Sequence, residues 1–179
     1  MRVAALLRGI NIGPSKRISM ADLRSIVEGL GHGDVETYLQ SGNVVFTPAA
    51  GAPDDLAGSL EQAIGKATGH DVPVVLRTGA ELARVVEANP YRVDDPTRVV
   101  VVFLGDELEP GQLGLGDLGD YLPDELTQVG RELFVSVPNG QAKSKLMEVL
   151  ARRRQPTTVT VRNWRTVAAL AELTAGPSD

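Results

Sequence analysis

The apolar segments of this 179-residue chain follow one order that is used twice, and that order constrains the fold more than any other feature. In each half, short apolar runs typical of buried strands and amphipathic runs typical of helices succeed one another as strand, helix, strand, strand, helix, strand. This is the element order of the ferredoxin-like unit. The sequence therefore predicts an α+β fold made by tandem duplication of that unit, with mostly antiparallel sheets and added linking and C-terminal helices.

The first half carries clear signals for where its first helix begins and ends. Ser19, with Asp22 three residues later, has the spacing of a helix-capping box, and Gly31 is a typical helix stop. The expected strands are 3–7, 35–39, 44–47 and 72–76, and the expected helices are 19–30 and 56–69.

The second half begins after a linking helix, which Thr78 and Glu81 open with the same capping-box spacing. The break between the halves falls near residues 88–97, so the predicted domains are residues 1–88 and 89–179. Residues 107–122 keep leucines at helical spacing, although their glycines weaken a helix. The further expected strands are 99–104, 126–129, 133–137 and 157–161, and the further expected helices are 144–150 and 163–173.

Three separated motifs occur in the order expected of one known family. They are "ALLRGINIG", "TYLQSGNVVF" and "VTVRNWRTVAAL", and they extend over nearly the whole chain. Together they resemble a widespread bacterial family known as domain of unknown function sixteen-ninety-seven, through its ALLRGIN, YLQSGN and RNW-T signatures. The resemblance implies an α+β protein of two ferredoxin-like halves. It implies no activity.

Composition excludes several classes of protein. The absence of cysteine excludes disulfides, thiol catalysis and cysteine-ligated metal centres. The net charge of −5 argues against a general nucleic-acid coating role, which needs a broadly basic surface. No apolar stretch approaches the roughly 18 residues of a membrane span, and the apolar run at 3–7 is too short for a signal peptide. We therefore expect a cytoplasmic protein that does not bind membranes.

Polar and glycine-rich segments follow the first two predicted strands. Because these strands run parallel in a ferredoxin-like unit, the two segments should meet at one edge of the sheet. An arginine offers a planar fork of donors to phosphate or carboxylate, glycines let backbone amides approach a ligand, and the nearby amino end of a helix adds partial positive charge. Neither segment contains an acid. The predicted anion-binding residues are Arg8, Asn11, Gly13, Lys16, Gln40, Ser41, Gly42 and Asn43, with Arg17 as a further cation.

A second polar cluster is expected where the last two strands of the second half end. Residues 141–165 contain seven cations and the single acid Glu148, whereas residues 106–125 contain seven acids and no cation. An aromatic ring in this cluster offers a face to a base or a guanidinium. Simpler roles stay open, since Asn163 also suits a helix cap and Trp164 suits packing between helix and sheet. The candidate residues are Lys143, Ser144, Lys145, Arg162, Asn163, Trp164 and Arg165.

The two histidines, His32 and His70, each follow a helix stop, where a cation favours the helix dipole. Both are expected at the edge of the first sheet opposite the Arg8 loop, so no nucleophile–base pair is identified and no catalytic residue is assigned. No spacing of His, Asp and Glu suggests a metal. Gly114, Gly116 and Gly119 match a dinucleotide-binding pattern, but they do not follow a strand directly. No cofactor and no metal are therefore expected.

These observations favour a binding protein for a small phosphorylated or carboxylated molecule at the loops after the first two strands. The structural alternative is that the glycines only permit tight turns and that Arg8 pairs with an acid such as Asp22 or Glu36. A second functional hypothesis is single-stranded nucleic-acid binding on the basic C-terminal face. A third is a protein-interaction module without catalysis, in which the acidic 106–125 segment of one copy meets the basic face of another.

Overall fold

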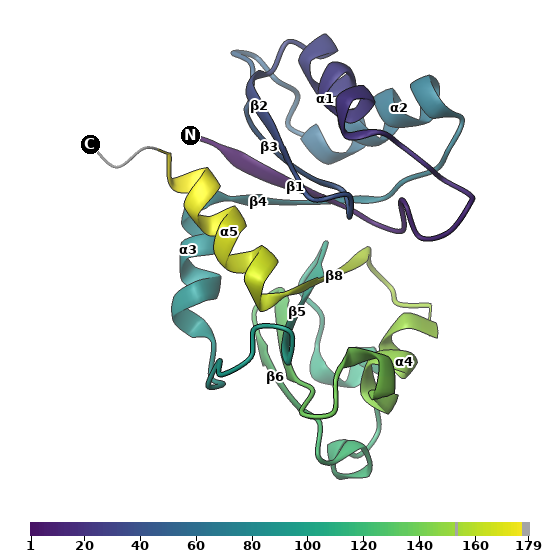
Figure 1. Ribbon diagram of the computed structural model, residues 1–179, viewed down its shortest axis with the longest axis vertical. Coiled ribbons are helices and arrows are strands. Elements are labelled where there is room, and N and C mark those ends of the chain that lie inside the picture. Colours follow the sequence, from purple (N-terminus) through teal and green to yellow (C-terminus); the bar gives the residue numbers. More distant parts are fainter. Residues whose placement is uncertain (153, 177–179) are drawn as a thin grey trace. The chain divides into compact units, whose positions relative to one another are not determined.

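A computed structural model describes residues 1–152 and 154–176, and in these residues the chain forms two four-stranded antiparallel sheets (Figure 1). The strand orders are β2-β3-β1-β4 and β6-β7-β5-β8. The second order repeats the first, with each strand replaced by the one four places later. The predicted α+β fold with duplicated ferredoxin-like topology is therefore confirmed.

The elements of the first sheet are β1 (Val3–Leu7), α1 (Met20–Gly29), β2 (Gly33–Tyr38), β3 (Asn43–Thr47), α2 (Leu56–Thr68) and β4 (Val74–Thr78). A linking helix, α3 (Gly79–Ala88), follows. The second sheet and its helices are β5 (Val99–Leu104), β6 (Glu125–Val129), β7 (Glu132–Ser136), α4 (Lys145–Arg152), β8 (Val159–Asn163) and α5 (Trp164–Ala175). Short 3₁₀ helices are η1 (Pro110–Leu113), η2 (Leu118–Tyr121) and η3 (Gln141–Lys143).

Each sheet has its own apolar core. In the first, α1 and α2 cover one face of the sheet (Figure 1). Side chains such as Leu23 and Ile64 pack on residues of β1, β3 and β4. In the second, Leu146 and Leu150 of α4 pack on β5 and β7, together with Leu113 of η1. Residues 107–122 therefore stand where the first helix of a ferredoxin-like unit would be. They form 3₁₀ turns instead of an α-helix, because glycines disfavour the longer helix.

The last strand of each half begins and ends two residues later than the sequence indicates. An arginine next to the end of each strand is almost fully buried: Arg77 is 1% exposed and Arg162 is 7% exposed. The two arginines occupy equivalent places, since Arg77 lies opposite Ala4 of β1 and Arg162 lies opposite Val101 of β5. Because arginine is polar, the apolar pattern of each strand stops before its true end.

Both arginines donate hydrogen bonds within their own strand. Arg77 donates through Nη1 to the Leu76 carbonyl at 2.8 Å, and Arg162 donates through Nη1 to Thr160 Oγ1 and to the Val161 carbonyl, each at 2.8 Å. Burial lowers the pKa of Arg162 to about 10, so its guanidinium remains charged at neutral pH.

The helix caps that the sequence indicates are confirmed. Ser19 Oγ accepts the Asp22 N–H at 2.9 Å. Thr78 and Glu81 satisfy one another reciprocally, because the Glu81 carboxylate accepts the Thr78 N–H and Thr78 Oγ1 accepts the Glu81 N–H. Asn163 Oδ1 accepts the Thr166 N–H at 3.0 Å and so begins α5.

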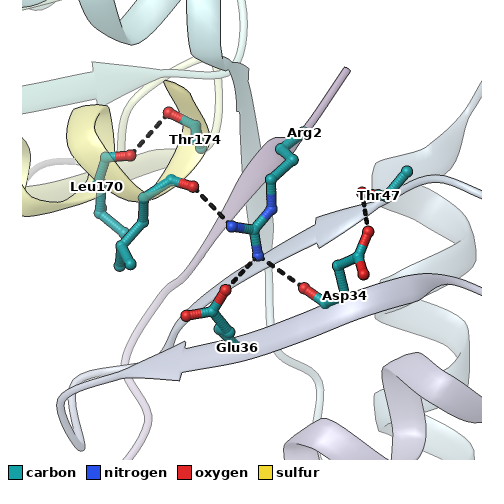
Figure 2. Close-up of polar contacts among 7 residues, drawn as sticks. Arg2, Asp34, Glu36, Thr47, Leu170 and Thr174 are labelled. Atoms are coloured by element: carbon teal, nitrogen blue, oxygen red, sulfur yellow. Dashed lines mark hydrogen bonds and ion pairs between the residues drawn. The ribbon is translucent and has the colours of Figure 1, made fainter. Parts of the chain in front are cut away.

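Among the described residues, 1–83 and 170–176 form one compact unit, and 84–152 and 154–169 form a second. Arg2 joins the two separate parts of the first unit. Its Nη1 donates to the Leu173 carbonyl of α5 at 2.8 Å, and its Nη2 donates to the Asp34 carbonyl and to Glu36 Oε1, both at 2.7 Å (Figure 2). One side chain thus attaches the last turn of α5 to β1 and β2.

None of the described helices has both the length and the apolar composition that crossing a membrane requires.

His32 is held as a neutral ring beside the core of the first unit. Its ring stacks on Phe46 with centroids 4.8 Å apart, and its Nδ1 accepts the Ala49 N–H at 3.1 Å. A nitrogen that accepts this bond cannot carry a proton. Burial lowers the pKa of His32 below its usual value, which agrees with that geometry.

We predict that His32 makes the free energy of unfolding decrease as the pH is lowered. Below the unfolded-state pKa of about 6.5, the unfolded chain binds more protons than the native state, so stability decreases as pH falls from about 7 to about 5. His32→Gln should reduce the slope of urea midpoint against pH across this interval. Equal slopes in the variant and in the wild-type protein would contradict the prediction.

Candidate anion-binding site

The loops after β1 and β2 lie side by side at one edge of the first sheet. Both β1 and β2 pair antiparallel with β3, so they run parallel to each other and end at the same edge. Two hydrogen bonds join the loops. The Leu7 N–H donates to the Gly42 carbonyl at 2.9 Å, and Asn11 Nδ2 donates to the Gln40 carbonyl at 2.8 Å.

Asn11 organises the first loop. Its Nδ2 also donates to the Ile18 carbonyl, and its Oδ1 accepts the Ile18 N–H, both at 3.0 Å. Its backbone takes the left-handed conformation with φ of 56°, which asparagine tolerates better than most residues. With both amide hydrogens donated to the protein, Asn11 shapes this edge and has no side-chain donor left for a ligand.

Asn43 has the same architectural role in the second loop. It is fully buried, and its Nδ2 donates to the Tyr38 carbonyl at 2.8 Å and to Ser41 Oγ at 3.0 Å. Gly42 lies between Ser41 and Asn43 in the sequence and has a φ of 83°. A Cβ at Gly42 would lie 2.7 Å from Ile10 Cδ1 and 2.9 Å from Leu7 Cβ, so the turn packs directly against the first loop.

A third segment, just before β4, completes this edge. The Arg8 N–H donates to the Pro73 carbonyl at 2.9 Å, and Lys16 Nζ donates to the Asp71 carbonyl at 2.8 Å. His70 precedes this segment, so the expectation that both histidines lie at the opposite edge is wrong for His70. The reason is that α2 returns the chain to the start of β4, whose Val74 pairs with the last residue of β1.

The predicted residues that remain exposed at this edge are Arg8, Gly13, Gln40 and Ser41. Among the described residues, the Arg8 guanidinium has no hydrogen bond and no ion pair, and Glu36 is bound by Arg2 instead. Arg17 is also exposed, and its Nε donates weakly to the Gly13 carbonyl at 3.3 Å. The cation with most freedom to meet a ligand is therefore Arg8.

A groove of about 310 Å³ adjoins the loop where α1 begins. It is lined by Arg17, Asp22, Ser25 and Thr68 among others. Asp22, already considered as a partner for Arg8, and Asp71 bring acids to this edge from outside the two loops, and only Asp71 was not expected there. The Asp71 contribution follows from strand order, because β4 is the neighbour of β1.

The second predicted cluster is only partly exposed. Ser144 is buried and its Oγ accepts the Met147 N–H at 2.9 Å, which caps α4. Arg162 is buried, and Asn163 caps α5. Lys143, Lys145 and Arg165 are exposed, and Trp164 is half-buried. Lys145 Nζ lies 5.9 Å from the centre of the Tyr121 ring.

Three other cations belong to the basic C-terminal segment, and of these Arg154 is exposed. Arg153 lies outside the described residues, as does the side chain of Arg152. Within the part of the chain that the structure describes, no group of three His, Asp or Glu side chains is arranged to hold a metal ion.

The fold and this edge define a duplicated ferredoxin-like α+β protein with a polar rim at one end of its first sheet. Residues 1–134 match the model of a family described as "Protein of unknown function (DUF1697)". Because the match covers more than half of the chain, the protein belongs to this family.

A solved structure described as conserved bacterial protein SP0830 from Streptococcus pneumoniae has the same fold. The two chains superpose with a TM-score of 0.80 at 23% sequence identity, over 97% of this chain and 98% of the other. At this level of identity the likeness shows the fold alone. No curated protein matches the chain.

We predict that Gly42→Ala is markedly more destabilising than Gly13→Ala. Both glycines have positive φ, at 83° and 91°, so both substitutions introduce backbone strain of about 1 kcal/mol. Only at Gly42 does the added Cβ also overlap side-chain atoms of the core, whereas at Gly13 it meets nothing within 4 Å. Overpacking should add about 1–3 kcal/mol at Gly42. Urea denaturation of the two variants measures the difference, and equal losses would contradict the packing of the two loops.

Proposed function

We propose that the protein binds a small anion carrying phosphate or carboxylate at the edge where β1 and β2 end. The observation that carries this proposal is the exposed guanidinium of Arg8, which has no partner among the described residues. Its backbone is fixed, because the Arg8 N–H bonds Pro73 and the preceding residue bonds Gly42. The anchored backbone keeps this unpaired guanidinium at the edge, where its planar fork of donors suits an anion.

The neighbouring groups suit the same ligand. The backbone N–H groups of Gly9, Gly13 and Ser15 donate to no acceptor in the described residues, and glycine permits the close approach of such amides to an anion. Ser41 is exposed in the adjoining turn. In this proposal Arg8, Gly13, Gln40 and Ser41 contact the ligand, while Asn11, Lys16, Gly42 and Asn43 hold the loops that present them.

The basic C-terminal face supports its alternative less well. Nucleic-acid binding there needs exposed cations beside an exposed aromatic ring. Arg162 is buried, Ser144 and Asn163 are used as caps, and Trp164 is half-buried. We therefore favour the anion site, and we propose a cytoplasmic setting from the composition of the chain.

We predict that Arg8→Gln abolishes most of the affinity for anions at this edge. The probes are inorganic phosphate, pyrophosphate, citrate and ATP, each measured by thermal shift and calorimetry. Loss of one charge-assisted interaction of about 1.5–3 kcal/mol weakens binding by about 10- to 150-fold.

The matched control is Arg24→Gln on α1. Arg24 is also an exposed arginine of the first unit, so this variant makes the same change of net charge without altering either loop. It should retain wild-type binding. Binding that survives Arg8→Gln, or that falls equally in both variants, would refute the proposed site.

A further inference from the structure

The second unit contains a cavity of about 600 Å³ that lies between β6 and residues 107–122. These residues include η1 and η2 and are called the 3₁₀ segment below. This volume lies within the range of about 300–1,000 Å³ that is typical of small-molecule sites. Leu113, Leu115, Leu118 and Leu126 contribute to its walls, with Gln128 as a polar residue and three glycines. The cavity belongs to the second unit alone, so it is separate from the edge that binds anions in the preceding proposal.

Three glycines of the 3₁₀ segment, which lack side chains, form part of the cavity wall. Gly114 and Gly116 both have positive φ, at 64° and 71°, where glycine is favoured over other residues. A Cβ added at Gly111 or Gly116 would meet no atom within 4 Å. These two exposed glycines therefore leave part of the 3₁₀ segment, called the arch below, unpacked on its outer side.

Specific hydrogen bonds hold that arch in place. The Tyr121 hydroxyl donates to the Leu115 carbonyl at 2.8 Å, and Gln128 Nε2 donates to the Leu108 carbonyl. At the start of η1, Gln112 Oε1 accepts the Glu109 N–H at 2.8 Å. The Gln128 bond ties the start of the segment to β6, and the other two bonds hold turns within the segment.

The walls select an apolar occupant. Leu113 is buried at the inner side, while Leu118 is 41% exposed and so borders the opening. The carboxamide oxygen of Gln128 is buried and accepts no hydrogen bond from the described residues. Since leucines dominate the walls, an aryl or alkyl group is a better occupant than water.

The segment that borders the cavity is acidic, which favours a cation, and Lys145 also lies beside it, with Nζ 5.9 Å from the centre of the Tyr121 ring. Residues 106–125, which include the arch, carry seven acids and no basic residue, namely Asp106, Glu107, Glu109, Asp117, Asp120, Asp124 and Glu125. Of these, all but Asp124 are exposed. Asp117 adjoins Leu118 in sequence, and its Oδ1 accepts the Gly119 N–H. A concentration of one sign of charge attracts ligands of the opposite sign and repels ligands of the same sign.

We propose that this cavity binds a small amphiphilic cation, an aryl or short alkyl group that bears an ammonium. The apolar group lies among the leucines, and the ammonium lies at the acidic opening. The walls supply affinity through burial of apolar surface, and the acids supply selectivity for the charged end.

The test uses three probes with the same apolar group: 4-phenylbutylamine, 4-phenylbutanol and 4-phenylbutyrate. Calorimetry on the full chain should give the tightest binding for the amine, about tenfold weaker binding for the alcohol, and weaker binding still for the carboxylate. The advantage of the amine over the alcohol should shrink at high salt, because surface charges are screened. In methyl NMR spectra the amine should shift the resonances of Leu113, Leu115 and Leu126.

A matched pair of variants locates the site. Leu118→Arg places bulk and positive charge at the opening, whereas Leu122→Arg makes the same change at a leucine that is 71% exposed and lies outside the walls. Binding of the amine should weaken at least about tenfold in the first variant and remain nearly unchanged in the second.

Three results would overturn the proposal. These are equal affinity for amine and alcohol, equal weakening in the two arginine variants, or wild-type spectra in which the leucine methyl resonances do not move. The spectra of the wild-type chain test the proposal even if Leu118→Arg fails to fold.

Discussion

The pairing of β1 on both of its edges is the constraint on which the first unit depends. Its five residues are buried, and they bond to β3 on one side and to β4 on the other, both antiparallel. Because β1 is paired on both edges, the neighbours of the loop that follows it are determined. That loop must lie beside the turn that precedes β3 and the segment that precedes β4. The polar rim is thus a consequence of strand order, and β5 has the equivalent central position in the second unit.

The polar residues of this rim divide into two kinds. Asn11 and Asn43 use their amide groups on backbone atoms of the loops, and Lys16 donates to a backbone carbonyl. Their hydrogen bonds replace the regular pairing that a loop lacks, which satisfies buried backbone groups. Arg8 differs, because its backbone is anchored while its side chain is exposed. The division separates residues that build the rim from a residue that can act on a ligand.

Charge is distributed unevenly along the second half of the chain. The arch over β6 carries only acids, and most of the cations come later, between residues 141 and 165. A modest net charge of −5 therefore conceals local fields of opposite sign. In the basic stretch, Arg162 and Ser144 are buried, whereas most acids of the arch are exposed. The acidic arch is consequently the more uniform of the two surfaces.

The sequence by itself determined the order of the elements, the central strands and the helix caps. These features depend on neighbours along the chain, such as the apolar run of β5 or Ser19 with the Asp22 N–H. Only the tertiary structure decided where β4 and β8 end, since burial of Arg77 and Arg162 depends on the environment supplied by distant residues. It likewise brought His70 and Asp71 to the edge beside Lys16. It also left a cavity beneath the 3₁₀ arch, because packing across a gap is a property of surfaces that no local pattern of residues records.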